Sequence, residues 1–326
     1  MRVFSLPPRP RLLAASLLGA CALGLAACSA EETTPAQVEA PVDLTVDPAR
    51  VLLQDPGQGP HRTLRYADRQ AEQRVTVEVG SGFDQQVMRA DAVQTQAPEA
   101  ADGVGEASTL TLPLRASSSA TPSDADSADE REVTTTLGHP TATTARAEDL
   151  EGTQDFELGW RGDDSGRVAS VNLAAPAEAS DEGRALVEQA LMKLLSLPVI
   201  FPEEPVGVGA VWSVDSRVTG EATLLQTTTY TLTALDGDDV ELAVSVQQRP
   251  AQGALTLDAP EGQGAQTLDV MNANTASSGS LRLNLGEPLP RSGEVALTTR
   301  VVYGQDASEV RVVQDSSTRV AFSTSS

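Results

Sequence analysis

The sequence predicts a mainly β protein, in which a large curved antiparallel sheet or half-barrel packs on one main helix at about residues 181–197. Three observations lead to this fold class. Apolar and polar residues alternate in many separate runs, which is typical of strands with one buried and one exposed face. Short sequences rich in glycine, aspartate or proline separate these runs. One stretch has apolar residues at helical spacing.

The predicted strands are spread over most of the chain. Their alternating apolar positions are Val75, Val77 and Val79; Leu110, Leu112 and Leu114; Phe156, Leu158 and Trp160; Val240, Leu242, Val244 and Val246; Leu281, Leu283 and Leu285; and Val295, Leu297, Val301 and Tyr303. The sequences DDSG at 163–166 and DGDD at 236–239 predict hairpins, because glycine supplies the positive φ of tight turns. A longer loop, GEPLPRSG at 286–293, joins the next pair.

The helix is predicted from the sequence SDEGRALVEQALMKLLSLP. Ser180 supplies the N-cap, acidic residues follow in the first turn, and Pro198 ends the helix. The apolar stripe on one side consists of Val187, Leu191, Leu194 and Leu195. We therefore expect this helix to pack on the sheet.

The N-terminus predicts a lipoprotein signal peptide over residues 1–27. Three arginines accompany an uncharged apolar stretch at 12–25, which is long enough for a signal-peptide core and short for a membrane span. The sequence LAAC at 25–28 then resembles the bacterial lipobox. This resemblance implies cleavage after Ala27 and attachment of a diacylglycerol to the thiol of Cys28.

A second lipobox match, LGAC at 18–21, fits less well because apolar residues still follow it. Cys21 would be removed with the signal peptide, so no free thiol would remain for catalysis or metal binding. The two acyl chains of a diacylglycerol suffice for stable anchoring. We therefore expect the protein at the extracytoplasmic face of the cell membrane, with residues 28–41 as a flexible lipidated tether.

Acidic residues outnumber basic ones by two to one. The chain has 46 acidic and 23 basic residues, for a net charge of −23. Loss of residues 1–27 removes three arginines, which leaves 20 basic against 46 acidic residues and a net charge of −26. Such a surface repels phosphate backbones, so we expect no nucleic-acid partner. Aromatic residues are only 3%, so the core must consist mainly of valine, leucine and alanine.

Residues 42–326 are expected to form a single β-rich domain, since this length can bury a large core. Three of its stretches are rich in Ala, Ser, Asp, Gly or Pro. We predict disordered insertions near 94–108, 116–131 and 250–279. The acidic run Asp124 to Glu130 could recruit calcium, although it lacks the glycine and the spacing of an EF-hand loop.

The sequence FPEEPVGVGAVW at 201–212 combines two prolines, two carboxylates, two glycines and one of the two tryptophans. It follows the helix and leads into a predicted strand. A phosphate-binding glycine loop has the opposite order, in which a strand precedes the glycines and a helix follows them. We therefore predict a structural corner with Trp212 buried.

The same region is similar to a family of uncharacterised bacterial secreted lipoproteins of actinobacterial type, with a domain of unknown function. In that family a segment P-x-x-P-V-x-V-G-x-x-W precedes antiparallel strands. The matching residues here are Pro202, Pro205, Val206, Val208, Gly209 and Trp212. No catalytic residue carries over. The layout is also reminiscent of the LolA, LppX and LprG lipoprotein carriers, in which a curved, half-closed sheet wraps a helix and holds acyl chains.

Residues suited to catalysis or metal binding are sparse. His61 begins the predicted strand HRTLRYA, His139 lies in a predicted turn, and no G-x-S-x-G nucleophile elbow occurs. Zinc needs three or four ligands, and the mature chain offers only a scattered set. Glu203 and Glu204 are adjacent on a proline-rich loop, where two carboxylates rarely aim at one bond. We expect no catalytic residue, no metal and no cofactor.

The leading hypothesis is a lipid-anchored cell-envelope protein without catalytic activity, which binds a lipid or another hydrophobic ligand in a groove of the sheet. A single helix about 24 Å long covers only part of so wide a sheet. Val75, Val77, Leu281 and Leu283 are predicted to line the groove. The alternatives are an envelope interaction scaffold and a carboxylate-dependent envelope hydrolase. An apolar cavity between sheet and helix would favour the carrier, and two inward-facing carboxylates would favour the hydrolase.

Overall fold

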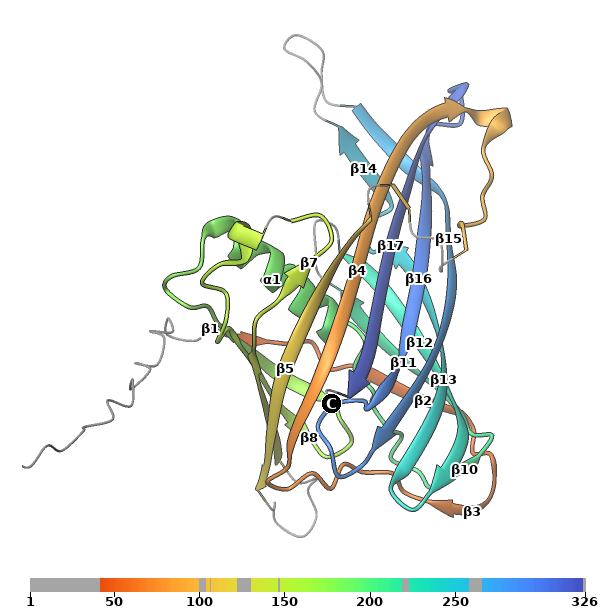
Figure 1. Cartoon of the computed structure of the whole chain (residues 1–326). Helices are drawn as coiled ribbons and strands as arrows, with labels where there is room; N and C mark the ends of the chain where they lie inside the picture. Colours follow the sequence, from red (N-terminus) through yellow and green to blue (C-terminus); the bar gives the residue numbers. More distant parts are fainter. Residues whose placement is uncertain are drawn as a thin grey trace, which may run out of the picture. The chain divides into compact units, whose positions relative to one another are not determined.

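The computed structural model describes residues 42–99, 104–105, 107–121, 130–145, 147–218, 223–257 and 266–324 (Figure 1). The chain divides into two compact units, Met1–Pro35 and Ala36–Ser326. The predicted signal peptide, Ala27, Cys28 and the tether lie outside the described residues, so all of them stay predictions. Every residue that the structure describes belongs to the second unit.

Fifteen antiparallel strands form one large sheet, which runs in the order β1-β9-β8-β6-β5-β4-β17-β16-β15-β13-β12-β11-β2, with β14 paired to β15 and β7 to β5. The strands are β1 (Val42–Thr45), β2 (Arg50–Asp55), β4 (Glu72–Arg89), β5 (Ser108–Thr121), β6 (Glu130–Leu137), β7 (Thr141–Ala142), β8 (Glu157–Asp163), β9 (Val168–Ala174), β11 (Val211–Val218), β12 (Leu224–Asp236), β13 (Asp239–Pro250), β14 (Ala254–Leu257), β15 (Gln266–Asn284), β16 (Ser292–Gly304) and β17 (Val310–Thr324). A separate small sheet pairs β3 (Gln58–Arg62) with β10 (Val206–Val208). This large curved sheet with one main helix confirms the predicted fold class.

The two edge strands of the sheet, β1 and β2, are neighbours in the sequence. In the described part of the chain, β1 pairs with β9 alone and β2 with β11 alone. The linker 46–49 joins them, so the facing strand ends lie within about 18 Å of each other. The sheet therefore curls until its edges approach, but it does not close. We call the gap between β1 and β2 the seam.

Helix α1 (Asp181–Leu195) packs inside the curve of the sheet, against β4 and β17 (Figure 1). As predicted, Ser180 caps it: the Oγ atom accepts a hydrogen bond from the Gly183 N–H at 3.0 Å. The buried residues of the helix are Gly183, Val187, Ala190, Leu191 and Leu194. The helix ends at Leu195, two residues earlier than predicted, because the position before Pro198 disfavours helical geometry.

Trp212 confirms the predicted corner. Its side chain is fully buried, and the indole Nε1 donates a hydrogen bond to the Ile200 carbonyl at 2.8 Å. The indole stacks on the ring of Tyr230 at 5.6 Å and approaches that of Phe201 at 6.3 Å. Gly209 turns the chain from β10 into β11 with a φ of 89°, which favours glycine. The sequence FPEEPVGVGAVW is therefore part of the core packing.

The predicted insertions are wrong over much of their length. β5 continues through 116–121 and β6 begins at Glu130, so only 122–129 of the second insertion lies outside the described residues. In the third predicted insertion, 250–279, strand β14 lies near the start and strand β15 begins at Gln266. The described part of 94–108 has a defined position as well. The Gln94 carbonyl accepts a hydrogen bond from Arg300 at 3.0 Å.

The polar run NANTASSGS is part of β15 because its backbone pairs with β16, and its hydroxyl groups replace the ladder to β13 on the other side. The ladder between β13 and β15 extends only from Asp239 to Ala243 on β13. Beyond it, hydroxyl groups take over the role of backbone acceptors. Ser277 Oγ accepts from the Val246 N–H at 2.8 Å, and Thr275 Oγ1 accepts from the Gln248 N–H at 3.0 Å. The backbone donors of the diverging strand are thereby satisfied.

The strands β4, β17, β16 and β15 continue past the start of β5 and, together with β14, form an extension that we call the arm (residues 82–89, 254–257, 266–278, 297–304 and 310–317; Figure 1). A second hydrophobic cluster lies in it and consists of Leu268, Val301, Tyr303 and Val312. The main core lies in the remainder of the sheet, in α1 and in the loops beside them, and it reaches the arm only at Leu297 among the described residues. Among the described residues, no helix has the length and apolar character needed to cross a membrane.

Candidate functional site

A cavity of 450 Å³ lies at the seam, and we call it the seam cavity. Its walls come from β1, the linker 46–49, β9, the C-terminal end of α1 and the end of β11. The lining residues are Leu44, Thr45, Val46, Asp47, Ala49, Val168, Val171, Met192, Leu195, Ser196, Pro198, Ile200, Ser216, Arg217, Val218 and Thr223. The cavity therefore lies between helix and sheet, where the sheet has its open edges.

The ends of three elements leave this space unfilled. β2 begins at Arg50, which pairs with Asp215, so residues 216–218 at the end of β11 have no β2 partner. β1 ends at Thr45, on the other side of the seam. α1 stops at Leu195 and is too short to cover the gap. The cavity is thus a consequence of where these elements end.

The seam cavity has an apolar wall and a polar rim. Ten of its sixteen lining residues are aliphatic, methionine or proline, from five different parts of the chain. The cavity is open to solvent at Leu44, because 48% of this large apolar residue is exposed. The charged lining residues are Asp47 and Arg217, both exposed. Such a site can bury an apolar group while its charged end stays in water.

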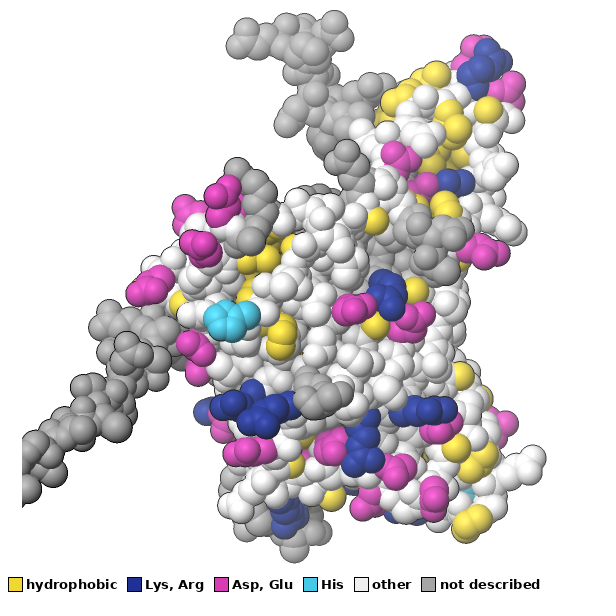
Figure 2. All heavy atoms as spheres, viewed as in Figure 1, with side chains coloured by type: hydrophobic (Ala, Val, Ile, Leu, Met, Phe, Trp, Pro, Cys, Tyr) yellow, Lys and Arg dark blue, Asp and Glu magenta, His cyan; other side chains and the backbone are white. Residues whose placement is uncertain are grey.

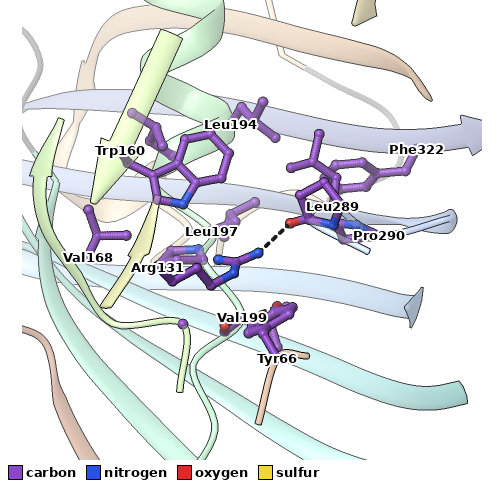
Figure 3. Close-up of a pocket in the computed structure, with 14 residues that line it drawn as sticks. Tyr66, Arg131, Trp160, Val168, Leu194, Leu197, Val199, Leu289, Pro290 and Phe322 are labelled. Atoms are coloured by element: carbon purple, nitrogen blue, oxygen red, sulfur yellow. Dashed lines mark hydrogen bonds between the residues drawn. The ribbon is translucent and has the colours of Figure 1, made fainter. Parts of the chain in front are cut away.

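A second, smaller cavity of 60 Å³ lies deeper in the molecule, and we call it the inner cavity (Figure 3). Its lining includes Trp160, Leu194, Leu197, Leu289 and Phe322, which Figure 3 shows around the space, with Arg131 and Tyr66 on one side of it. Val168, Leu195 and Pro198 line both cavities. These three residues therefore form a shared wall between the seam cavity and the inner cavity.

Arg131 is the one charged residue that lines the inner cavity, and it is neutralised. Its guanidinium binds the Asp68 carboxylate through bonds of 2.7 to 3.0 Å, and it also donates to the Pro288 carbonyl at 3.2 Å. The guanidinium carbon lies 4.1 Å from the centre of the Tyr66 ring. Burial raises the pKa of Tyr66 to about 12, so this phenol is neutral at physiological pH. The inner cavity carries no net charge.

The four predicted groove residues belong to the hydrophobic core. Val75 and Val77 have 0% of their surface exposed, and Leu281 and Leu283 have 2%. None of the four lines the seam cavity or the inner cavity. They are covered because α1 and the facing strands pack on the middle of the sheet. The unfilled space lies instead at the edges of the sheet.

The described residues contain two buried acids, Asp68 and Asp315, and each is bound by an arginine. Asp68 lies beside the inner cavity, whereas Asp315 pairs with Arg300 on the outer face of the arm. They do not form the carboxylate pair that a glycan hydrolase needs. His61, His139, Glu203 and Glu204 are all exposed. No group of three or more metal-binding side chains occurs among the described residues.

No family model matches the sequence, and no curated protein matches it. The similarity to secreted lipoproteins of unknown function and to the lipoprotein carriers therefore stays a prediction. The candidate site follows from the geometry of this chain alone.

Most of the residues that line the seam cavity are not predicted from the sequence. Helical spacing places Leu195 on the apolar stripe of the helix, and alternation places Val168 in a strand. Leu44, Val46 and Ala49 are assigned to no element by such patterns. The signal that could have found them is the spacing VDLTVDPARVLL at 42–53, where two short apolar runs flank a proline.

Proposed function

We propose that this protein is a lipid-anchored envelope lipoprotein that holds the apolar part of an amphiphilic ligand in the seam cavity and performs no catalysis on it. The observation that carries the proposal is an apolar cavity of 450 Å³ between helix and sheet, with charged residues only at its rim. Ligand pockets commonly have volumes of about 300–1,000 Å³. The seam cavity is therefore large enough for a small amphiphile.

An alkyl chain suits this site for energetic reasons. Each methylene group that leaves water contributes about 0.8 kcal/mol and needs no hydrogen bond. The walls offer aliphatic contacts from Val171, Met192 and Ile200, while serine and threonine lie among the polar lining residues. A polar ligand of the same size would leave its hydrogen-bonding groups unsatisfied on the apolar side.

Lipid anchoring at Cys28, as predicted from the sequence, would suit this function. Leu44 lines the cavity and follows Cys28 by sixteen residues. The predicted tether 28–41, as a flexible chain of fourteen residues, would have a root-mean-square span of roughly 19–22 Å and could extend to about 50 Å. A tether of this length would keep the domain at the membrane, which is the source of amphiphiles.

The test uses the mature chain from residue 28 with Cys28→Ala, so that its own acyl groups cannot enter the cavity. The protein is incubated with single fatty acids from lauric to arachidic acid and examined by native mass spectrometry. We expect one bound fatty acid per chain. The Ala49→Trp variant should lose binding because the indole fills the cavity, whereas Ala307→Trp, at an exposed position in the turn between β16 and β17, should retain it. A folded wild-type chain that takes up no fatty acid would contradict the proposal.

The arm favours a second candidate, an interaction scaffold without a ligand. Phe83, Val87 and Val310 are 54%, 69% and 50% exposed. Hydrophobic side chains gather over the arm at the top of Figure 2, more densely than on the rest of that face. Concentrated exposed apolar surface is typical of interaction sites. The test is a triple variant in which Phe83, Val87 and Val310 are all changed to serine. Unchanged fatty-acid uptake by this variant would separate the scaffold role from ligand binding.

A further inference from the structure

The shared wall between the two cavities is the feature that carries a further inference. Val168, Leu195 and Pro198 each line the seam cavity on one side and the inner cavity on the other. We infer that Leu195 sets the length of the alkyl chain that the protein accepts, and that the ligand has a single chain whose end points to the inner cavity. This inference rests on the proposed function.

Leu195 is the member of the wall that can move most easily. It is the last residue of α1, and it is half-buried, whereas Leu191 and Leu194 of the same stripe are buried. Pro198 has a fixed ring, and Val168 is β-branched and stiff about its first side-chain bond. A leucine side chain can change between staggered rotamers without a change of the backbone. Leu195 can therefore open or close the passage between the cavities.

The distribution of charged residues favours one orientation of the ligand in the cavity. Asp47 and Arg217 lie at the rim of the seam cavity, and neither has an ion pair in the described part of the chain. At the other end, Arg131 is fully engaged by Asp68, and the rest of the inner lining is mainly apolar. A polar headgroup is therefore favoured at the rim, and a hydrocarbon end is favoured toward the inner cavity.

The volume of the inner cavity limits what lies beyond Leu195. Its 60 Å³ corresponds to the share of about two water molecules in the liquid. In the wild type, the end of a long chain would have to displace the Leu195 side chain to reach this space. Truncation of Leu195 would join the two cavities and add the volume of the missing side chain. A bulkier side chain would shorten the seam cavity at the same place.

The experiment compares chain-length profiles. The mature chain with Cys28→Ala is incubated with an equimolar mixture of fatty acids from lauric to arachidic acid, and bound species are counted by native mass spectrometry. Leu195→Ala should shift the profile toward longer chains, and Leu195→Phe should shift it toward shorter ones. Leu186→Ala is the matched control, because this half-buried leucine of the same helix lines neither cavity.

The expected size of the shift follows from methylene burial. If truncation lets about two more methylene groups enter, the ratio of the longest to the shortest bound fatty acid should rise about tenfold. The same profile in wild type, Leu195→Ala and Leu195→Phe would overturn the role of Leu195 and leave the proposed function standing. Absence of bound fatty acid from the folded wild type would overturn both. If Leu195→Ala fails to fold, an unshifted profile of Leu195→Phe decides against the inference.

Discussion

Lys193 is the single lysine of the chain, and it lies on α1 with most of its side chain covered. Burial lowers the pKa of its amine from 10.5 to about 8. The charged form is therefore disfavoured in the folded state relative to the unfolded chain. Between these two pKa values the unfolded chain binds more protons than the folded one. The contribution of Lys193 to stability consequently rises as the pH increases from about 8 to 10.5.

We expect Lys193→Met to be more stable than the wild type below pH 8, because methionine needs no hydration of a charge. The advantage should shrink as the pH rises above about 8, where the wild-type lysine loses its proton in the folded state. Urea unfolding of both proteins at several pH values measures the difference. A difference in unfolding free energy that stays constant with pH would show that the amine titrates normally.

At the scale of the element, α1 depends on a glycine for its contact with the 3₁₀ turn at Ala147–Leu150. Alanine usually stabilises an interior helix position by about 0.5–1 kcal/mol relative to glycine. At Gly183, however, an added Cβ would lie 2.3 Å from the Asp149 carbonyl oxygen and 3.0 Å from Thr153 Cγ2. The close contact with the neighbouring backbone outweighs the helix propensity.

We therefore predict that Gly183→Ala lowers the free energy of unfolding by about 1–3 kcal/mol, as overpacking usually does. Chemical denaturation monitored by circular dichroism measures the change. Gly253→Ala is the control, since an added Cβ there meets nothing within 4 Å, and it should change stability by less than about 0.5 kcal/mol. Equal stability of Gly183→Ala and wild type would mean that the turn moves away at no cost.

At the scale of the whole molecule, the proposed membrane anchoring rests on the predicted lipobox at 25–28. We expect wild-type protein to incorporate labelled palmitate and to partition into the detergent phase. Cys28→Ala should abolish both and leave an unprocessed or slowly released precursor, because no thiol remains for the diacylglycerol. Cys21→Ala tests the alternative lipobox and should behave like the wild type. If Cys28→Ala partitions like the wild type, the lipoprotein assignment is wrong.

The fold of the second unit also depends on the whole molecule, because its sheet joins strands that are far apart in sequence. β4 pairs with β17 along fifteen residue pairs, although more than two hundred residues separate the strands. The linker 46–49 then places the two edges of this sheet opposite one another. The candidate site arises where these two edges approach each other, and no single element contains it.

The local patterns predicted the strands with clear alternation and the start of the helix correctly, but they missed the strand segments 116–121 and 266–279. Alternation identifies which side of a strand is buried, as for Val75 and Leu281, and the cap at Ser180 marks where α1 begins. Such patterns depend on interactions between near neighbours in the sequence. The corner at Trp212 was predictable for the same reason, since a helix stop, glycines and an alternating strand follow each other directly.

The tertiary structure alone decided what covers each buried face. Alternation assigned Val77 and Leu283 to an apolar face, but α1 and the opposite strands fill that part of the curve. It also decided that the polar run in β15 is a strand, because the run pairs with β16 while hydroxyl groups of Thr275 and Ser277 bind the backbone of β13. The position of the unfilled space depends on where β1, β2 and α1 end relative to one another. Those positions are set by strand pairing over long distances, which no local pattern records.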